Sequence, residues 1–249
     1  MQQRLPSLLA PPVTFAHRGA RAHERENTIA GFQLALRLGA TGLESDVWMT
    51  ADDQVVLDHD GAVRQGLRKR PLKGIERAAL PGHIPTLAEL LDACPGDWHL
   101  SLDLKDPDTG AAVIALVRAT RPALLGRLWL CHPSLDVLGE LRPEATDGVR
   151  LVHSTRLNRL GAGPERHAAM LAEAAIDAIN MHHTDWSGGL TTLFHRFDRL
   201  CLAWDLQFPD VLRNAVRMGM DGVFSDFTDR MVEAVAIESG SRPGAAPPT

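Results

Sequence analysis

Short apolar segments alternate along the chain with longer segments in which apolar residues recur every three or four positions. The short segments predict strands at 13–17, 41–47, 97–104, 127–132, 149–153, 177–182, 199–204 and 221–226. The longer segment after each of them has the spacing of an amphipathic helix, and several begin with Thr, Ser or Pro, as helix N-termini prefer. The pattern therefore predicts eight strand–helix units.

Eight such units in 249 residues, joined without a long structureless loop, predict one α/β domain folded as a TIM (β/α)₈ barrel. An open doubly wound sheet is the alternative. We expect the barrel to span residues 1–239, with a short insertion at approximately 55–97 between its second and third strands. Residues 240–249 are rich in Pro, Gly and Ala, and we expect a disordered tail there.

Composition and charge narrow the function classes. Apolar residues make up 45% of the chain and charged residues 23%, which is ordinary for a globular protein with a sizeable core. The net charge of −5 gives no reason to expect a nucleic acid as partner. The opening MQQRLPSLLAPP lacks the apolar region of a signal peptide, and no stretch has the length of a membrane span, so we expect a cytoplasmic location. Cys94, Cys131 and Cys201 lack CxxC spacing and predict buried free thiols.

Polar side chains gather at the ends of the expected strands, where the active sites of TIM barrels lie. They are His17, Arg18, Glu44, Asp46, Asp103, Lys105, His132, His153, His182, Trp204 and Asp226. Polar residues often begin loops, which accounts for some of these positions but not for a carboxylate pair inside a strand. We expect His132, His153, His182 and His183 to brace strand ends and assign them no chemical role.

The carboxylates indicate a metal site. Glu44 and Asp46 are two apart on an expected strand, so both face the same side while Ser45 faces the other. Two carboxylates facing one barrel interior repel each other unless a cation or a proton neutralises them. With Asp103 as a third ligand, the set suits one divalent cation, Mg²⁺ or Ca²⁺. The alternative is a surface strand end with salt-bridged acids.

Histidines and cations complete the candidate chemistry. His17 and His59 suit general acid and base roles because the reference pKa of histidine, about 6.5, is close to neutral pH. Arg18 and Lys105 would offer positive charge to an anionic group. The inventory fits hydrolysis of a phosphate ester, and equally a metal-dependent aldolase or a sugar isomerase.

At these residues the chain resembles the glycerophosphodiester phosphodiesterase family. The matching pieces, in the family's order, are AHRGA, ENTIAGFQLALRLGATGLESDV, the spaced motif T-x-D-x-x-V-V-L-D-H-D, IPTLAELL, LSLDLK, AWDLQ and GMDGVFSDFTD. The resemblance covers nearly the whole chain. It implies a TIM barrel, a divalent metal, and hydrolysis of glycerophosphodiesters to glycerol 3-phosphate and an alcohol. The nucleophile that it implies is either water or the glycerol 2-hydroxyl.

The resemblance also implies roles for individual residues. The catalytic acid and base match His17 and His59, the first two metal ligands match Glu44 and Asp46, the phosphate contacts match Arg18 and Lys105, and the pocket-wall tryptophan matches Trp204. The family usually has Glu at the position of Asp103, where the chain looks more like sphingomyelinase D-type phospholipases. The expected insertion is also shorter than usual, which implies an open mouth and a bulkier leaving group.

Two local features carry expectations of their own. Gly19 should let the chain turn after the first strand, and Asn27 is the expected cap of the first helix. The stretch 64–77 holds six cations, which predicts a solvated basic face or, alternatively, a weak contact with anionic head groups or a membrane surface.

Three functions compete. The first is an active glycerophosphodiester phosphodiesterase, acting on a small-molecule substrate. The second is a lysophospholipase D or sphingomyelinase D-like enzyme that takes a lysophospholipid. The third is a catalytically silent barrel that binds a ligand, and the full set of His17, His59, Glu44 and Asp46 argues against it.

Overall fold

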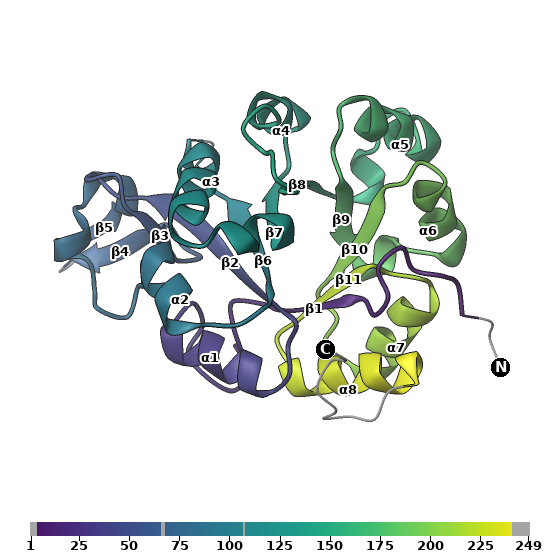
Figure 1. The fold of residues 1–249 in the computed structure, drawn as a ribbon, viewed down its shortest axis with the longest axis horizontal. Helices are drawn as coiled ribbons and strands as arrows, with labels where there is room; N and C mark the ends of the chain where they lie inside the picture. The colour runs from purple at the N-terminus through teal and green to yellow at the C-terminus, as the bar shows by residue number, and fades with distance from the viewer. Residues whose placement is uncertain (1–3, 66–67, 107, 241–249) are drawn as a thin grey trace.

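The computed structural model describes residues 4–65, 68–106 and 108–240, in which eight parallel strands close into a barrel (Figure 1). The barrel strands are β1 (Val13–Ala16), β2 (Gly42–Met49), β6 (His99–Leu104), β7 (Leu128–His132), β8 (Arg150–Thr155), β9 (Ala178–His182), β10 (Leu200–Trp204) and β11 (Gly222–Ser225). Strand β1 pairs in parallel with both β11 and β2, which closes the sheet. The predicted TIM barrel is confirmed, and the open sheet is excluded.

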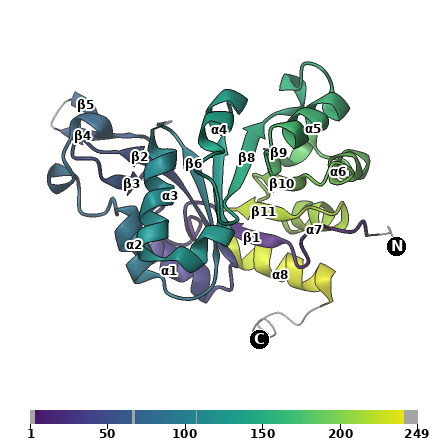
Figure 2. The ribbon, with the colours of Figure 1, turned by 45° about the horizontal axis from the view of Figure 1, so that its top comes forward.

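A helix follows each barrel strand along the chain, and the helices surround the strands in Figures 1 and 2. The helices are α1 (Ile29–Arg37), α2 (Leu87–Ala93), α3 (Thr109–Thr120), α4 (Leu135–Leu141), α5 (Pro164–Glu173), α6 (Gly188–His195), α7 (Pro209–Arg217) and α8 (Thr228–Ser239). All eight expected helical segments are confirmed. Within the described ranges, no helix is long and apolar enough to cross a bilayer.

Aromatic side chains fill the barrel interior. Phe15 stacks on Phe224 with 4.6 Å between ring centroids and meets Trp129 edge-on at 5.7 Å. Gly42 and Gly222 lie on the strands that flank β1 and leave room for this cluster, because a Cβ on Gly42 would lie 2.6 Å from the Phe15 ring. The interior is therefore packed below the mouth.

The second apolar layer lies between the strands and the helices, and it orients β2. Leu43 and Val47 are fully buried in this layer, together with Phe32 of α1. Because side chains alternate along a strand, Glu44 and Asp46 face the barrel interior instead. The predicted orientation of the carboxylate pair is confirmed.

The connection from β2 to β6 carries additional structure. It contains β3 (Val55–Leu57), antiparallel to β2, and a hairpin of β4 (Ala62–Gln65) and β5 (Arg68–Pro71), which projects from the barrel in Figures 1 and 2. Two short 3₁₀ turns, Leu72–Gly74 and Arg77–Ala79, lead from it to α2. Val56, Leu72 and Ile84 pack into a small apolar core beneath the hairpin.

The domain bounds 1–239 and the comparison of this insertion with the family stay predictions. Residues 66–67 of the basic stretch and 241–249 of the expected tail lie outside the described residues.

The prediction that Asn27 caps the first helix is wrong. The N-cap of α1 is Thr28, whose Oγ1 accepts a hydrogen bond from the Gly31 backbone N–H at 3.1 Å. Asn27 is buried with a φ of 52°, and its Oδ1 accepts a hydrogen bond from the Ser45 hydroxyl at 2.8 Å. Ser45 points out of the barrel toward this loop, so Asn27 ties the loop to β2.

Candidate functional site

Three carboxylates meet at the C-terminal ends of β2 and β6. The parallel register places Asp46 directly beside Asp103, with Glu44 one pleat below on the same face of β2. One oxygen of each carboxylate lies within 4.8 Å of the others, and Glu44 and Asp46 are buried. The structure thus brings together all three predicted metal ligands.

The charges of this cluster are incompletely compensated. The pKa of Glu44 is raised to about 7, mainly by burial and also by the nearby Asp46 and Asp103 carboxylates, although His17 opposes the shift. Burial also raises the pKa of Asp103. Asp46 Oδ2 is buried and has no hydrogen-bond partner. A buried acceptor is rarely left unpaired, so these three residues fit a hard divalent cation such as Mg²⁺ or Ca²⁺.

Arg18 and Lys105 supply the positive charge beside the carboxylates. Lys105 Nζ lies 2.9 Å from Asp46 Oδ1 and 3.2 Å from Asp103 Oδ2. Burial lowers the pKa of Lys105, but the two carboxylates outweigh it and the net shift is upward. Arg18 donates its backbone N–H to Glu44 Oε2 at 2.8 Å and keeps its Nε 3.6 Å from Asp46 Oδ2.

A tight turn delivers Arg18 to this position. Arg18 and Gly19 both have positive φ, 51° and 82°. A Cβ on Gly19 would lie 2.9 Å from the carbonyl carbon of Gly31, so the predicted role of Gly19 in the turn is supported by both its conformation and its packing.

His17 is held by a carboxylate that the sequence analysis left without a role. Its Nδ1 lies 2.6 Å from Asp226 Oδ1, and its Nε2 lies 3.8 Å from Glu44 Oε2. Burial works to lower the pKa of His17, but Glu44 and Asp226 outweigh it and raise the pKa. Because an ionised Asp226 can only accept, it fixes the proton on Nδ1 and leaves Nε2 facing Glu44.

His59 lies in the loop after β3. Its Nδ1 is 3.0 Å from Asp60 Oδ1, and its side chain is 41% exposed. Trp48 of β2 steadies this loop by donating its Nε1–H to the Asp58 carbonyl at 2.8 Å. His59 therefore reaches the site from a loop, whereas His17 reaches it from a barrel strand.

One cavity of about 560 Å³ joins these residues at the barrel mouth. It is lined by His17, Arg18, Glu44, His59, Asp103, Lys105, Ser154, Thr155, Arg156, Arg159, Asn180, Trp204, Asp205 and Phe224. Of the predicted site residues, all but Asp46 line it, and Asp46 lies beside Asp103 and Lys105. Trp204 stands in the wall with its ring edge-on to His182, 4.6 Å between centroids.

The sequence analysis gave no role to several residues at this cavity. Asp226 was predicted only to lie at the end of a strand. The motif GVFSD sets Asp226 directly after an apolar strand, just as AHRG does for His17. Asn180 lies inside an apolar strand, and Arg156 and Arg159 lie just before and at the end of the short 3₁₀ segment Leu157–Arg159 after β8, with no motif around them. Nothing in the local sequence distinguishes these three from structural residues.

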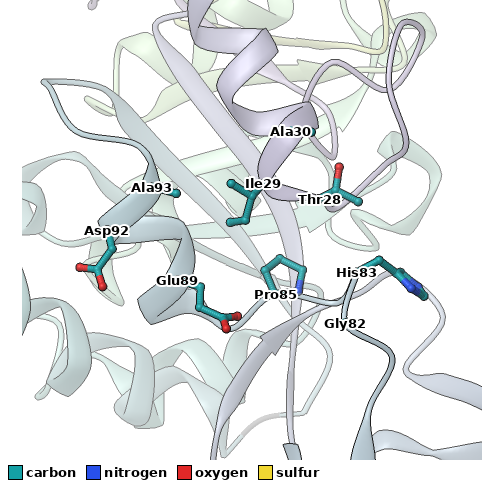
Figure 3. Close-up of a pocket in the computed structure, with 9 residues that line it drawn as sticks. All are labelled: Thr28, Ile29, Ala30, Gly82, His83, Pro85, Glu89, Asp92 and Ala93. Atoms are coloured by element: carbon teal, nitrogen blue, oxygen red, sulfur yellow. The ribbon is translucent and has the colours of Figure 1, made fainter. Parts of the chain in front are cut away.

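A larger hollow of about 650 Å³ lies elsewhere, between the start of α1 and α2, beside the segment 82–85 (Figure 3). Three ionisable residues line it, His83, Glu89 and Asp92, and Glu89 accepts a hydrogen bond from the Thr86 backbone at 2.7 Å and lies 3.2 Å from Arg77. Glu89 is thus already used by the capping box of α2. Hydrogen bonds of this kind stabilise the start of the helix and leave Glu89 without a free role in the hollow.

Two further clusters of potential ligands occur in the described residues. Asp221 lies near His195 and Cys201, but its two oxygens accept hydrogen bonds from Ser7, Leu8, Leu9, Cys201 and His195. His182 lies near His183 and Asp205, with its Nε2 3.1 Å from Asp205 and its Nδ1 2.7 Å from the Thr184 hydroxyl. The ligand atoms of Asp221 and His182 are therefore already engaged in hydrogen bonds within the protein.

Comparisons with known proteins agree with this geometry. The model of the glycerophosphoryl diester phosphodiesterase family matches residues 17–230. A "Probable glycerophosphodiester phosphodiesterase 2" from Mycobacterium tuberculosis is 26% identical over 94% of this chain and 94% of its own length. A "Probable glycerophosphodiester phosphodiesterase 1" from the same species is 38% identical over 92 residues, 37% of this chain and only 30% of that relative.

A solved structure shares the fold. It is a phosphodiesterase from Oleispira antarctica in complex with the product sn-glycerol-3-phosphate, with a TM-score of 0.71 and 21% identity, over 90% of this chain and 96% of that one. Because the family model covers most of the chain, the protein belongs to the glycerophosphoryl diester phosphodiesterase family.

Proposed function

We propose that the protein hydrolyses glycerophosphodiesters to glycerol 3-phosphate and an alcohol, using one divalent cation. The observation that carries this proposal is the cluster of Glu44, Asp46 and Asp103 beside His17, in a cavity that also presents Arg18 and Lys105. Carboxylates for a metal, a histidine for a proton and cations for a phosphate are the parts that phosphodiester hydrolysis needs. Family membership and the product complex of the Oleispira relative support it.

Glu44, Asp46 and Asp103 would hold the cation, Mg²⁺ or Ca²⁺. When bound, it would act as a Lewis acid that stabilises negative charge on a phosphoryl oxygen. Asp103 is one methylene shorter than the glutamate expected at its position, yet its register with Asp46 sets it beside the other two ligands. The shorter side chain is therefore compatible with a three-carboxylate site.

The remaining residues of the proposed site move protons and neutralise charge. Asp226 holds the proton on His17 Nδ1, so Nε2 is the atom that would exchange a proton with the substrate. His59 would serve the opposite proton transfer from its loop. Arg18 and Lys105 would offset the charge of the phosphate, and Trp204 would contact the substrate from the wall.

The test is a glycerol 3-phosphate release assay on glycerophosphoethanolamine and glycerophosphocholine. Chelator-treated protein should be inactive, Mg²⁺ or Ca²⁺ should restore activity, and His17→Ala should lower kcat about 10²- to 10⁴-fold. His23→Ala is the matched control, because His23 Nε2 forms a similar pair with Asp229 Oδ1 at 3.0 Å, and neither residue lines the cavity. Product formation that needs neither metal nor His17 would refute the proposal.

A lipid substrate is the second candidate, in the manner of a lysophospholipase D or a sphingomyelinase D. The exposed cations of β5, Arg68 and Lys69, favour it because Lys69 Nζ lies 3.9 Å from Asp60 Oδ2, in the loop that carries His59. Weak contact with an anionic surface would then raise activity on lysophospholipids alone. Salt should inhibit turnover of lysophospholipid in anionic vesicles much more than turnover of glycerophosphoethanolamine, and equal inhibition would count against a surface contact.

The proposal also includes a cytoplasmic location. The three cysteines are free and buried, and burial raises the pKa of each thiol, which suits a reducing compartment. Fractionation of the producing cell would test this part.

A further inference from the structure

The cavity has a second side, of which the proposed function uses only Trp204. We call it the far side: the lining residues contributed by β8, β9, β10 and the turns after them, namely Ser154, Thr155, Arg156, Arg159, Asn180, Trp204 and Asp205. In the strand order of the barrel it is separated from β1, β2 and β6 by β7 and β11. A phosphodiester held by the carboxylate side would extend its alcohol toward the far side.

Asn180 points to a ligand. The residue is only 6% exposed, lines the cavity, and its Oδ1 is buried without a hydrogen-bond partner. A buried amide oxygen is normally paired, and Asn180 is one of the residues that line the cavity. Asn180 is therefore ready to accept a hydrogen bond from an N–H or O–H of a molecule bound there.

Trp204 is less suited to a quaternary ammonium than an open aromatic wall would be. The guanidinium of Arg156 already lies over the ring, 5.8 Å from its centroid. Arg156 is held there by Asp185, with 2.5 Å from its Nε and 3.2 Å from an Nη. A choline group at this ring would meet a like charge, and it has no N–H to offer to Asn180.

Arg159 is the free cation of the far side. Within the described ranges its guanidinium has no hydrogen-bond or ion-pair partner, although it lines the cavity. The nearest carboxylate of the far side, Asp205, is engaged by His182 at 3.1 Å and by Gln207 at 3.1 Å. Asp136 lines an adjoining hollow of about 400 Å³ together with Arg159 but forms no ion pair with it.

We propose that Asn180 and Arg159 bind the leaving alcohol and select one that carries both a hydrogen-bond donor and a negative charge. This inference rests on the proposed function and names its substrate class. Asn180 Oδ1 accepts from the ammonium or hydroxyl of the head group, and Arg159 binds its carboxylate or phosphate. Head groups that have both are favoured, and choline, which has neither, is the poorest.

Glycerophosphoserine and glycerophosphoethanolamine give a matched test because they differ by one carboxylate. We expect kcat/KM to be about tenfold higher for glycerophosphoserine, and Arg159→Gln to lower that ratio to about one. Arg159→Lys should retain part of it. Arg166→Gln is the control, since Arg166 is an exposed cation of α5 outside the cavity and loses the same charge.

Asn180 is tested with a second pair. Asn180→Ala should lower kcat/KM several-fold for glycerophosphoethanolamine but not for glycerophosphocholine, whose ammonium has no N–H. Equal losses on both substrates would assign Asn180 to the fold instead of to the head group.

The outcomes separate this inference from the proposed function. If Arg159→Gln lowers kcat/KM equally for serine and ethanolamine substrates, or changes neither, the subsite is refuted while the hydrolase stands. If the wild-type protein turns over no glycerophosphodiester with either metal, the proposed function fails. The subsite is then tested by calorimetry on the His17→Ala variant and on the His17→Ala, Arg159→Gln double variant. The measured quantity is the ratio of the Kd values for glycerophosphoserine and glycerophosphoethanolamine. If Arg159→Gln leaves that ratio unchanged, the subsite is refuted.

Discussion

The acidic side of the cavity, formed by the ends of β1, β2 and β6, and the far side defined above differ in how their polar groups are satisfied. On the acidic side, His17, Arg18 and Lys105 each lie within 4 Å of a carboxylate, and the cluster still has an excess of buried negative charge. On the far side, Arg156 and Asp205 are paired within the protein, while Asn180 and Arg159 have unused capacity.

From this difference we infer that the acidic side carries the chemistry and the far side carries the substrate preference. An excess of buried carboxylate is unfavourable without a cation, so the acidic side is suited to holding a metal. The unpaired groups of the far side, the buried Asn180 Oδ1 and the exposed Arg159 guanidinium, are available to a ligand bound in the cavity. We therefore expect changes on the acidic side to act on kcat and metal affinity, and changes on the far side to act on substrate preference.

Asp226 gives the sharpest test of the acidic side. Asp226→Asn removes the carboxylate that fixes the proton on His17 Nδ1, and we expect kcat to fall on the order of 10²-fold with KM little changed. Steady-state kinetics would measure it, with Asp229→Asn, which alters the exposed pair with His23, as the control. A large rise in KM at unchanged kcat would place Asp226 in binding instead.

Asp103 tests whether the three carboxylates act as one metal site. Asp103→Asn should weaken Mg²⁺ or Ca²⁺ binding by about tenfold, or about 1.4 kcal/mol, because one of three ligand charges is lost. The readout is the rise in Tm on adding metal, which should shrink in the variant. Asp97→Asn, an exposed aspartate paired with Arg127, should leave it intact. An undiminished rise for Asp103→Asn would remove Asp103 from the ligand set.

The raised pKa of Glu44 predicts how stability of the metal-free protein depends on pH. Its folded pKa is about 7 against 4.5 for the ordinary side chain, so the folded state holds a proton that the unfolded state releases. The contribution of Glu44 to the free energy of unfolding is fully present below pH 4.5. It is lost as pH rises through about 7, and the loss is about 1–3 kcal/mol.

Urea unfolding at pH 5 and pH 8, in chelator, would measure this loss as the difference between wild type and Glu44→Gln. The comparison with the variant matters because the pKa of His153, lowered by burial to about 4, produces an opposite slope between pH 4 and 6.5 in both proteins. Saturating metal should reduce the wild-type loss at pH 8. Identical pH dependence in both proteins would contradict the assigned shift.

The smallest effect is expected on the far side. Trp204→Phe keeps an aromatic face toward Arg156 but shortens the wall, and we expect KM to change about two- to threefold with kcat unchanged. A fall in kcat comparable to that of Asp226→Asn would erase the distinction between the two sides.

Much of the acidic side could be predicted from sequence because its residues stand in short patterns. A period of two places Glu44 and Asp46 on one face, and their position near the end of a strand places them at a barrel mouth. His59 was proposed from its side-chain chemistry, although it lies on a loop that no periodicity describes, and the resemblance to the family matched it to the acid–base pair. Asp226 was not assigned because it meets His17 across the closure of the barrel, between the first and last strands.

The cap of α1 shows why local chemistry was insufficient. Asn27 and Thr28 both suit an N-cap, and nothing within the loop chooses between them. Ser45 makes the choice from β2, by engaging the Asn27 amide and leaving Thr28 to cap.

The eight strand–helix units and the common facing of Glu44 and Asp46 follow from periodicity within a few residues, and the sequence therefore predicts them. Only the tertiary structure decided that the sheet closes, that Asp103 lies beside Asp46, and that Asn180 and Arg159 line the cavity opposite the carboxylates. Those relations join residues distant in the chain, and they depend on strand register and packing, which no local pattern encodes.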